Sequence, residues 1–158
     1  MTKTLVTYFS ASGVTAELAK RLAKVVNADI YEIRPQQPYT DADLNWMDKQ
    51  SRSTLEMKDL SCRPAIANAM PDVQKYDVVF VGFPVWWYRE PSIIDTFMES
   101  ADFAGKTVVP FATSGTSGVG DSGKNMQELA PGAKVFEGKR FDARAKEDEL
   151  KQWAAQWL

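Results

Sequence analysis

The sequence predicts an α/β fold in which a parallel β-sheet is covered by helices on both faces. Short apolar runs alternate along the chain with segments of helical periodicity, which is the element order of a doubly wound sheet. The strongest run, residues 77–83 (DVVFVGF), is rich in β-branched residues and typical of a strand buried on both faces. Because 158 residues suit one core, we expect a single domain over residues 1–158.

The first third of the chain predicts two strands joined by a helix. Residues 4–9 (TLVTYF) form an apolar run typical of a buried strand. In residues 15–26, leucines and a valine recur at helical spacing and define one apolar face. Residues 28–33 (ADIYEI) alternate more strongly between apolar and polar, which indicates a strand nearer the edge of the sheet.

The segment from residue 35 to residue 76 has the weakest pattern. A structureless stretch of this length is uncommon in a compact domain, so we expect at least one helix between residues 41 and 58. Leu44, Met47 and Leu55 can share a helical face there. The charged residues of the same segment are interpreted as a solvated surface.

The second half predicts six further elements. In chain order they alternate between strand and helix, at residues 77–83, 91–98, 106–112, 122–129, 134–137 and 143–158. Pro91 suits the first turn of its helix, where an N–H is not needed. The last helix places Leu150, Trp153 and Trp157 on its buried side.

Composition excludes several classes of function. The net charge is -2 and no basic stripe is visible, which disfavours a nucleic-acid partner, and no apolar run approaches the length of a membrane span. A single cysteine, Cys62, and an N-terminus that runs directly into a core strand favour a cytoplasmic protein. The chain contains no histidine, which removes Ser-His-Asp and Cys-His catalysis and the commonest metal ligand. We therefore expect no catalytic side chain and no metal site, and any redox chemistry must come from a bound organic cofactor.

Three loops that follow predicted strands have unusual compositions, and ligands of open α/β sheets bind where such loops meet. The first, residues 10–15 (SASGVT), combines three hydroxyls with a glycine at the start of a helix, which suits an anion. The alternative is that Ser12 only caps that helix. The second, residues 84–91 (PVWWYREP), holds three consecutive aromatics that cannot all enter one core, so some can stack on a planar ligand. The third, residues 113–120 (TSGTSGVG), can bring backbone groups close to the edge of a flat heterocycle.

Taken together, these loops resemble the cofactor site of the flavodoxin family. The first loop resembles the FMN phosphate loop, and residues 82–91 (GFPVWWYREP) are similar to the flavin-side loop of a bacterial branch with a P-x-W-W element. Residues 43–46, 52–53 and 56–64 are similar to the same branch. The resemblance covers nearly the whole chain.

The resemblance implies a three-layer α/β/α fold with a five-stranded parallel sheet in the order 2-1-3-4-5, and non-covalent FMN. Three groups of residues are implied to hold the phosphate, to flank the isoalloxazine, and to reach its pyrimidine edge or its other face. In that order they are Ser10, Ser12, Gly13, Val14 and Thr15; Pro84, Trp86, Trp87 and Tyr88; and Thr113, Ser114, Gly115 and Gly118.

The chain departs from well-known flavodoxins in three respects. Its net charge is only mildly negative, no glycine lies between Pro84 and Pro91, and the loop over residues 113–120 has no aromatic. Three functions are weighed: an FMN electron carrier, an FMN enzyme that oxidises NAD(P)H and reduces a quinone or similar acceptor, and a phosphorylation switch. The switch is disfavoured because Ser10 and Ser12 stand where its acidic Mg²⁺ ligands would be needed. No second dinucleotide site is recognisable, so a carrier with a partner protein or a small-molecule acceptor is favoured over the reductase.

Overall fold

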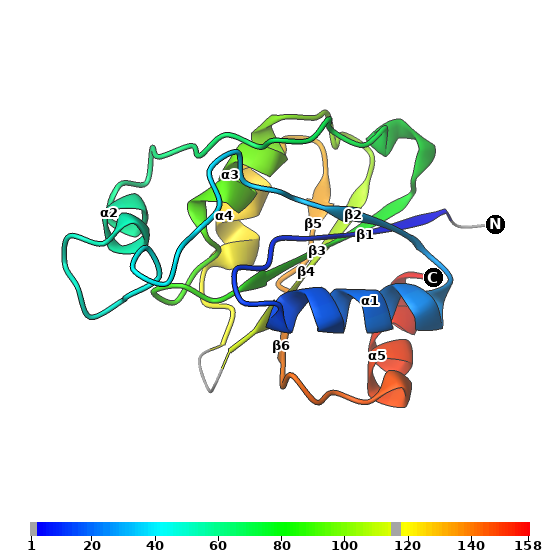
Figure 1. Cartoon of the computed structure of the whole chain (residues 1–158). Helices are drawn as coiled ribbons and strands as arrows, with labels where there is room; N and C mark the ends of the chain where they lie inside the picture. Colours follow the sequence, from blue (N-terminus) through cyan, green and yellow to red (C-terminus); the bar gives the residue numbers. More distant parts are fainter. Residues whose placement is uncertain (1–2, 115–117) are drawn as a thin grey trace.

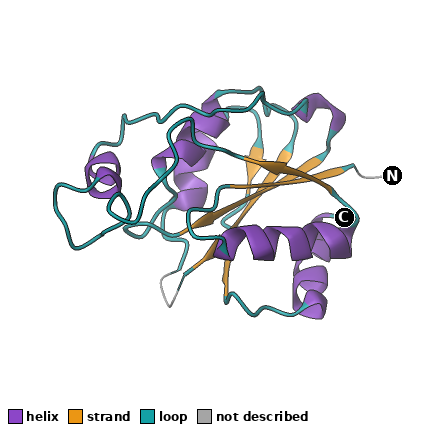
Figure 2. Cartoon of the chain, in the orientation of Figure 1, coloured by secondary structure: helices purple, strands orange, loops and turns teal. Residues whose placement is uncertain are grey.

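The sheet has the strand order that the sequence predicts. The computed structural model describes residues 3–114 and 118–158, and its parallel strands follow the order β2-β1-β3-β4-β5 (Figures 1 and 2). The strands are β1 (Thr4–Tyr8), β2 (Asp29–Glu32), β3 (Val78–Pro84), β4 (Thr107–Thr113), β5 (Lys134–Val135) and β6 (Lys139–Phe141). The helices are α1 (Val14–Val26), α2 (Arg52–Lys58), α3 (Ser92–Glu99), α4 (Ser122–Leu129) and α5 (Glu147–Ala154), with 3₁₀ turns at Val73–Lys75 and Ala155–Trp157.

The helices form a layer on each face of the sheet, and each layer encloses its own apolar core. Helices α1 and α5 pack together below the sheet in Figure 1, while α3 and α4 lie on the other face. The lower core contains Leu18, Leu22 and Leu150, whereas the upper core contains Ile94 and Phe97, and all five are fully buried. Strands covered on both faces in this way must be apolar throughout, which explains the unbroken run in β3.

The register brings the three candidate loops to one edge of the sheet. In β1 Leu5 pairs with Val79 of β3, and Val79 pairs with Val108 of β4. Because the three strands are parallel and aligned, their carboxyl ends meet on the same side of the molecule, which is the end that carries α2 in Figure 1. This edge is where a ligand of an open α/β sheet binds.

The fifth strand is split in two, which the sequence analysis did not anticipate. Residues 134–137 were expected as one strand, but β5 ends at Val135 and a sixth strand, β6, pairs with the far end of β4. Between them lies Pro110 of β4, which has no N–H to donate to the outer strand. Position 138 requires a glycine, because the Cβ of any other residue would clash with the Pro110 carbonyl oxygen at 2.3 Å. The proline in β4 therefore explains the interruption.

The helix expected between residues 41 and 58 is present, but it is short. Only α2, a helix of seven residues, forms within residues 41–58, and Leu44 and Met47 lie in turns before it rather than on a shared helical face. Ser51 caps α2 by accepting a hydrogen bond from the Thr54 N–H. This cap fixes the start of the helix at Arg52, eleven residues after the start of the expected interval. No helix in the described part of the chain has the length and apolar character needed to cross a membrane.

Candidate functional site

The loop between β1 and α1 leaves the helix N-terminus open. Gly13 is the N-cap of α1 with φ 93°, and no side chain of the described residues caps the helix. The alternative that Ser12 caps α1 is therefore wrong. The Ser10 hydroxyl instead accepts a hydrogen bond from the Gly13 N–H at 3.0 Å, which shapes the loop. The first amides of α1 have no partner within the helix, and together with the helix dipole they favour an anion at this point.

Thr15 connects the first loop to the end of β4. Its hydroxyl is buried and lies 2.7 Å from the hydroxyl of Thr113. One hydroxyl proton is used between the two oxygens, so the other remains available to an acceptor. Val14, in contrast, is exposed at the first turn of α1 and can contribute only its backbone amide. The pair Thr15–Thr113 thus joins two of the three loops before any ligand binds.

The aromatic loop after β3 is a tight hairpin turn. The N–H of Trp86 donates to the carbonyl of Arg89, and the N–H of Arg89 donates to the carbonyl of Trp86, both at 3.1 Å. The two residues between them, Trp87 and Tyr88, have φ 47° and 63°. Positive φ at both central residues of a two-residue loop is the pattern of a type I′ turn, which normally takes asparagine, aspartate or glycine. Large aromatics in these positions are strained, and such strain concentrates at functional sites.

The hairpin divides its three aromatics between the core and the surface. Trp86 packs edge-on against Phe9 and Tyr39, with ring centroids 5.6 and 5.3 Å away. Trp87 is 39% exposed and Tyr88 is 74% exposed. The expectation that some of the three rings face solvent or a ligand is therefore confirmed for Trp87 and Tyr88, while Trp86 closes the floor of the site.

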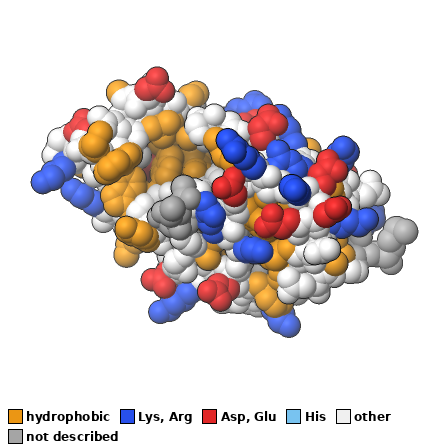
Figure 3. Space-filling model, turned by 90° about the horizontal axis from the view of Figure 1, so that it is seen from below, with side chains coloured by type: hydrophobic (Ala, Val, Ile, Leu, Met, Phe, Trp, Pro, Cys, Tyr) orange, Lys and Arg blue, Asp and Glu red, His pale blue; other side chains and the backbone are white. Residues whose placement is uncertain are grey.

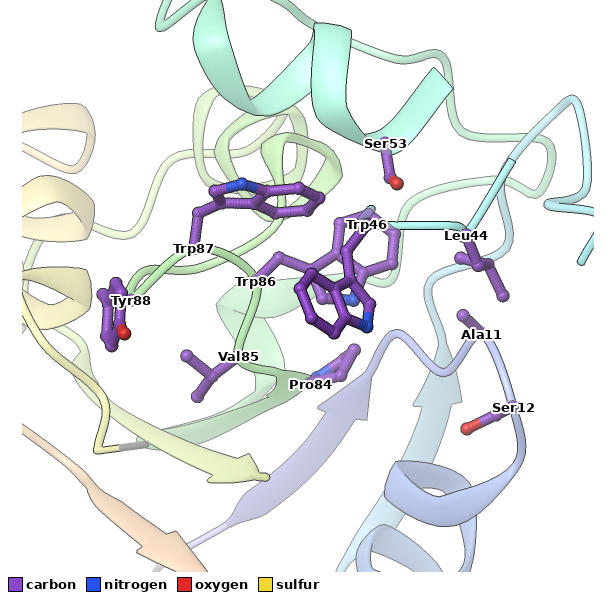
Figure 4. A pocket seen from close by; sticks show the side chains of 10 residues that line it. All are labelled: Ala11, Ser12, Leu44, Trp46, Ser53, Pro84, Val85, Trp86, Trp87 and Tyr88. Carbon is purple, nitrogen blue, oxygen red and sulfur yellow. The ribbon is translucent and has the colours of Figure 1, made fainter. Parts of the chain in front are cut away.

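One cavity joins the first two loops. Its volume is about 430 Å³, a size typical of small-ligand pockets. Figure 3 shows apolar side chains gathered around a hollow at the end of the molecule that carries α2. Figure 4 shows the residues that line the cavity, and all ten are uncharged: Ala11, Ser12, Leu44, Trp46, Ser53, Pro84, Val85, Trp86, Trp87 and Tyr88. Five of the residues implied by the resemblance are thus brought together: Ser12, Pro84, Trp86, Trp87 and Tyr88.

The far wall of this cavity comes from the middle segment, whose charged residues the sequence analysis interpreted as solvated surface, although Arg52 and Glu56 are in fact largely buried. Leu44 and Trp46 in the turns before α2, and Ser53 in its first turn, face the hairpin across the cavity (Figure 4). Trp46 is 70% exposed, whereas Ser53 is only 1% exposed. The signal that could have found them is the isolated tryptophan at position 46, because a large aromatic outside any apolar periodicity is typical of a binding surface.

A charged network holds this wall in place. The Arg52 guanidinium lies 3.8 Å from the Tyr39 ring centroid and pairs with Glu56 at 2.9 Å. The Tyr39 hydroxyl donates to the same Glu56 at 2.5 Å, and burial together with this bond raises the pKa of Tyr39. Because Tyr39 also contacts Trp86, the network ties α2 to the floor of the site.

The third loop meets the site only in part. Ser114 accepts hydrogen bonds from Arg140 of β6, at 2.7 Å through its carbonyl, so a cation that the loop composition could not reveal lies beside it. Gly118 is exposed, and Gly115 lies outside the described residues. Thr113, Ser114 and Gly118 are not among the lining residues of the cavity. The third loop instead approaches the hairpin closely at Gly120, where an added Cβ would lie 2.0 Å from the Tyr88 carbonyl oxygen.

A buried carboxyl lies directly behind the hairpin. Glu90 is 0% exposed and accepts hydrogen bonds from the Asn125 side-chain amide of α4 at 2.8 and 3.3 Å. Burial and the nearby charge of Asp95 raise the pKa of Glu90 to about 8. The Arg89 guanidinium lies 3.7 Å from Glu90 and 3.5 Å from Asp95, which offsets part of that rise. Arg89 also donates to the Met57 carbonyl at 3.1 Å, so the hairpin is anchored to both α4 and α2.

Comparison with known proteins agrees with this arrangement. A family model described as flavodoxin matches residues 3–157 of the chain. A flavoprotein of Bacteroides eggerthii DSM 20697 is 45% identical, with a TM-score of 0.92 and coverage of 99% of this chain and 98% of its own. A flavoprotein of Bacteroides uniformis ATCC 8492 is 47% identical, with a TM-score of 0.91 and 98% of both chains covered.

A more distant structure shares the fold. The flavoprotein of Lactobacillus acidophilus NCFM, whose structure is a complex with FMN, is 23% identical with a TM-score of 0.71, and the alignment covers 98% of this chain and 99% of that one. A search among curated proteins found no match to the chain.

Proposed function

This chain belongs to the flavodoxin family, and on that premise we propose that it binds FMN non-covalently and works as an electron-transfer flavoprotein. The observation that carries the proposal is the cavity that joins Ala11 and Ser12, in the loop just before the open N-terminus of α1, to the aromatic hairpin. One end offers amides and hydroxyls for a phosphate monoester, and the other offers aromatic faces for a planar ring. The similarity to a flavoprotein determined in complex with FMN supports the same ligand.

Three groups of residues would hold the cofactor. Ser10, Ser12, Gly13, Val14 and Thr15 would bind the phosphate through amides and hydroxyls without a lysine or arginine in the loop. Pro84, Trp86, Trp87 and Tyr88 line the cavity and would flank one side of the ring. The family resemblance assigns its pyrimidine edge or its other face to Thr113, Ser114 and Gly118, which lie outside the cavity lining, and to Gly115, which lies outside the described residues. Bound flavin supplies the electron-accepting centre that the side chains of this chain lack.

A second candidate function is an FMN-dependent reductase that takes electrons from NAD(P)H and passes them to a small molecule. The observation in its favour is the wall of Leu44, Trp46 and Ser53. This wall faces the hairpin and would enclose one face of the bound flavin ring in a concave site that can take a small substrate. Steady-state turnover with NADH or NADPH and a quinone separates the two, because a carrier alone would not turn over without a partner reductase.

FMN binding is tested by titrating the chain without cofactor. We expect one FMN per chain and a rise in the melting temperature, since a ligand at 100 times its dissociation constant adds about 2.7 kcal/mol of stability. Riboflavin should raise it less, because it lacks the phosphate that the α1 N-terminus would bind. If FMN changes neither the melting temperature nor the visible spectrum of the protein, the proposal fails.

A further inference from the structure

Among the described residues that line the cavity, one buried polar side-chain atom has no hydrogen-bond partner. Ser53 is 1% exposed, and its hydroxyl has no hydrogen-bond partner among the residues that the structure describes. Figure 4 shows the hydroxyl directed away from α2 and toward the cavity, between Trp46 and Leu44. Leaving a buried hydroxyl without a partner destabilises a protein, so such a group indicates a partner that is absent from the free chain.

The position of Ser53 is fixed by its backbone and its neighbours. Its N–H donates to the Asp43 carbonyl at 3.0 Å, and α2 is capped at Ser51 just before it. The adjacent Arg52 pairs with Glu56 and with Asp43, at 2.9 and 3.8 Å. The hydroxyl is therefore presented by a rigid element, as expected for a group that contacts a ligand.

The surroundings of the hydroxyl define the chemistry that it can recognise. Leu44, Trp46 and Ser53 carry no charge, so this wall suits an uncharged ligand. Two of the three indoles in the cavity, those of Trp46 and Trp87, are 70% and 39% exposed, so they offer apolar surface to a flat ring. A serine hydroxyl donates one hydrogen bond, and a ring carbonyl oxygen is the matching acceptor. This wall therefore suits a flat, uncharged ring that carries a carbonyl.

We propose that Ser53, with Trp46 and Leu44, forms a subsite for an uncharged electron acceptor of the quinone class, on the side of the cavity away from the strand ends. The inference rests on the proposed function, because it assumes FMN on the loops that follow β1, β3 and β4. Ser53, Trp46 and Leu44 come from a different segment, between β2 and β3, and face those loops across the cavity. A second planar molecule can therefore lie between that wall and the cofactor.

The test measures binding to the oxidised, FMN-loaded protein by equilibrium dialysis. The probe is 2,3-dimethyl-1,4-naphthoquinone, whose substituted ring cannot add the thiol of Cys62, and the control ligand is 2,3-dimethylnaphthalene, which lacks the oxygens. Ser53→Ala should weaken quinone binding by roughly 3- to 10-fold, the range for one hydrogen bond. It should leave the affinities for the hydrocarbon and for FMN unchanged.

Ser51→Ala is the matched control two residues earlier in the chain. Its hydroxyl accepts from the Thr54 N–H and lies 2.9 Å from the Thr54 hydroxyl, so its loss should lower the melting temperature without changing quinone affinity. Ser53→Ala, in contrast, should not lower the melting temperature of the cofactor-free chain, because it removes an unpaired group. A fall as large as that of Ser51→Ala would make Ser53 a structural residue and overturn the proposal.

The remaining outcomes separate this proposal from the assignment of the cofactor. FMN binding is measured first, and its absence in the unaltered chain would refute the proposed function itself. If FMN binds but the quinone does not, or if Ser53→Ala binds the quinone as the unaltered chain does, the subsite is refuted and the cofactor stands. If Ser53→Ala weakens FMN instead, Ser53 belongs to the cofactor site and the acceptor subsite is again refuted.

Discussion

Glu90 should make the stability of the cofactor-free protein fall as the pH rises through neutrality. Burial raises its pKa to about 8 in the folded chain, whereas an unfolded glutamate titrates near pH 4. Between these values the folded state binds a proton that the unfolded state does not, so the free energy of unfolding decreases with rising pH. Linkage gives a loss of about 2 to 3 kcal/mol between pH 5 and pH 7 from this group alone.

The sequence makes this pH window unusually simple to interpret. The chain has no histidine, the side chain that ordinarily titrates between pH 5 and pH 8. Burial also raises the pKa of Asp95 to about 6, against the charges of Arg89 and Arg63, so Asp95 adds a loss of the same sign at the acid end. Glu99, which pairs with Arg63, is the remaining carboxyl of this cluster in the described residues.

Glu90→Gln isolates the contribution of the single carboxyl. The amide oxygen of glutamine can still accept from Asn125, but the side chain cannot ionise. The variant should therefore be more stable than the unaltered chain at pH 8, and the difference should grow by about 3 kcal/mol between pH 5 and pH 8. Glu128→Gln on the same helix as Asn125 is the control, since Glu128 is exposed and the charge removed from the unfolded chain is identical.

Urea unfolding of the three cofactor-free proteins at pH 5, 6, 7 and 8 measures these differences. The reasoning is refuted if the unaltered chain has the same free energy of unfolding across the series. It is also refuted if Glu128→Gln and Glu90→Gln shift the pH dependence equally, because the effect would then come from net charge rather than from burial.

Three further experiments test the loops around the cavity. Ser12→Asp should weaken FMN binding strongly, because it places a carboxylate beside the phosphate. The stability of the cofactor-free chain should not change, because Ser12 does not cap α1. An unchanged FMN affinity in a titration would mean that the phosphate lies elsewhere. Trp87→Ala should weaken FMN binding by roughly 1 to 3 kcal/mol. Trp86→Ala should mainly lower stability in urea, by about 1.5 to 3 kcal/mol, since the partly buried Trp86 packs against the core. Equal effects of both substitutions on FMN binding would contradict this division. Tyr88→Gly should be more stable than Tyr88→Ala by about 1 kcal/mol, because only glycine adopts positive φ without strain. If thermal unfolding shows the alanine variant to be equally stable or more stable, the backbone at Tyr88 is not strained.

The sequence predicted the fold because its strands are buried on both faces. A strand such as β3 has to be apolar at every position, which makes it visible without any alignment, and the predicted range differs from the observed one by a single residue at each end. The strand order itself came from the family resemblance and is confirmed. The split of the outer strand was missed because its cause, Pro110, lies in the neighbouring strand rather than in residues 134–141.

The candidate site was predicted where its residues follow strands and missed where they do not. Ser12 and the residues after β3 are placed by the sheet, so their meeting follows from topology. Leu44, Trp46 and Ser53 belong to turns and a short helix whose position depends on tertiary contacts, including the ring of Tyr39 between Arg52 and Trp86. Arg140 was missed for the same reason, since it reaches Ser114 from a strand 26 residues later.

The backbone of the hairpin adopts a conformation that its own residues do not favour. Between Pro84 and Pro91 the sequence offers no residue that favours positive φ, yet Trp87 and Tyr88 both adopt it. Contacts outside the turn impose this conformation, because Arg89 is held by the Met57 carbonyl of α2 and Gly120 lets the third loop close against the Tyr88 carbonyl. The strain is therefore supported by two neighbouring segments rather than by local propensity.

Helix α2 supports both the hairpin and the floor of the cavity, so substitutions in α2 should affect the whole site. Because α2 contacts the hairpin through Arg89 and the floor of the cavity through Tyr39, both walls of the cavity share one set of anchors. A substitution that loosens α2 would also release the exposed aromatics that face it, whereas one at the tip of the hairpin would leave α2 in place. The spacing between the Trp87 and Ser53 sides of the cavity is thus set by α2, and the width available to a planar ligand depends on residues that never touch it.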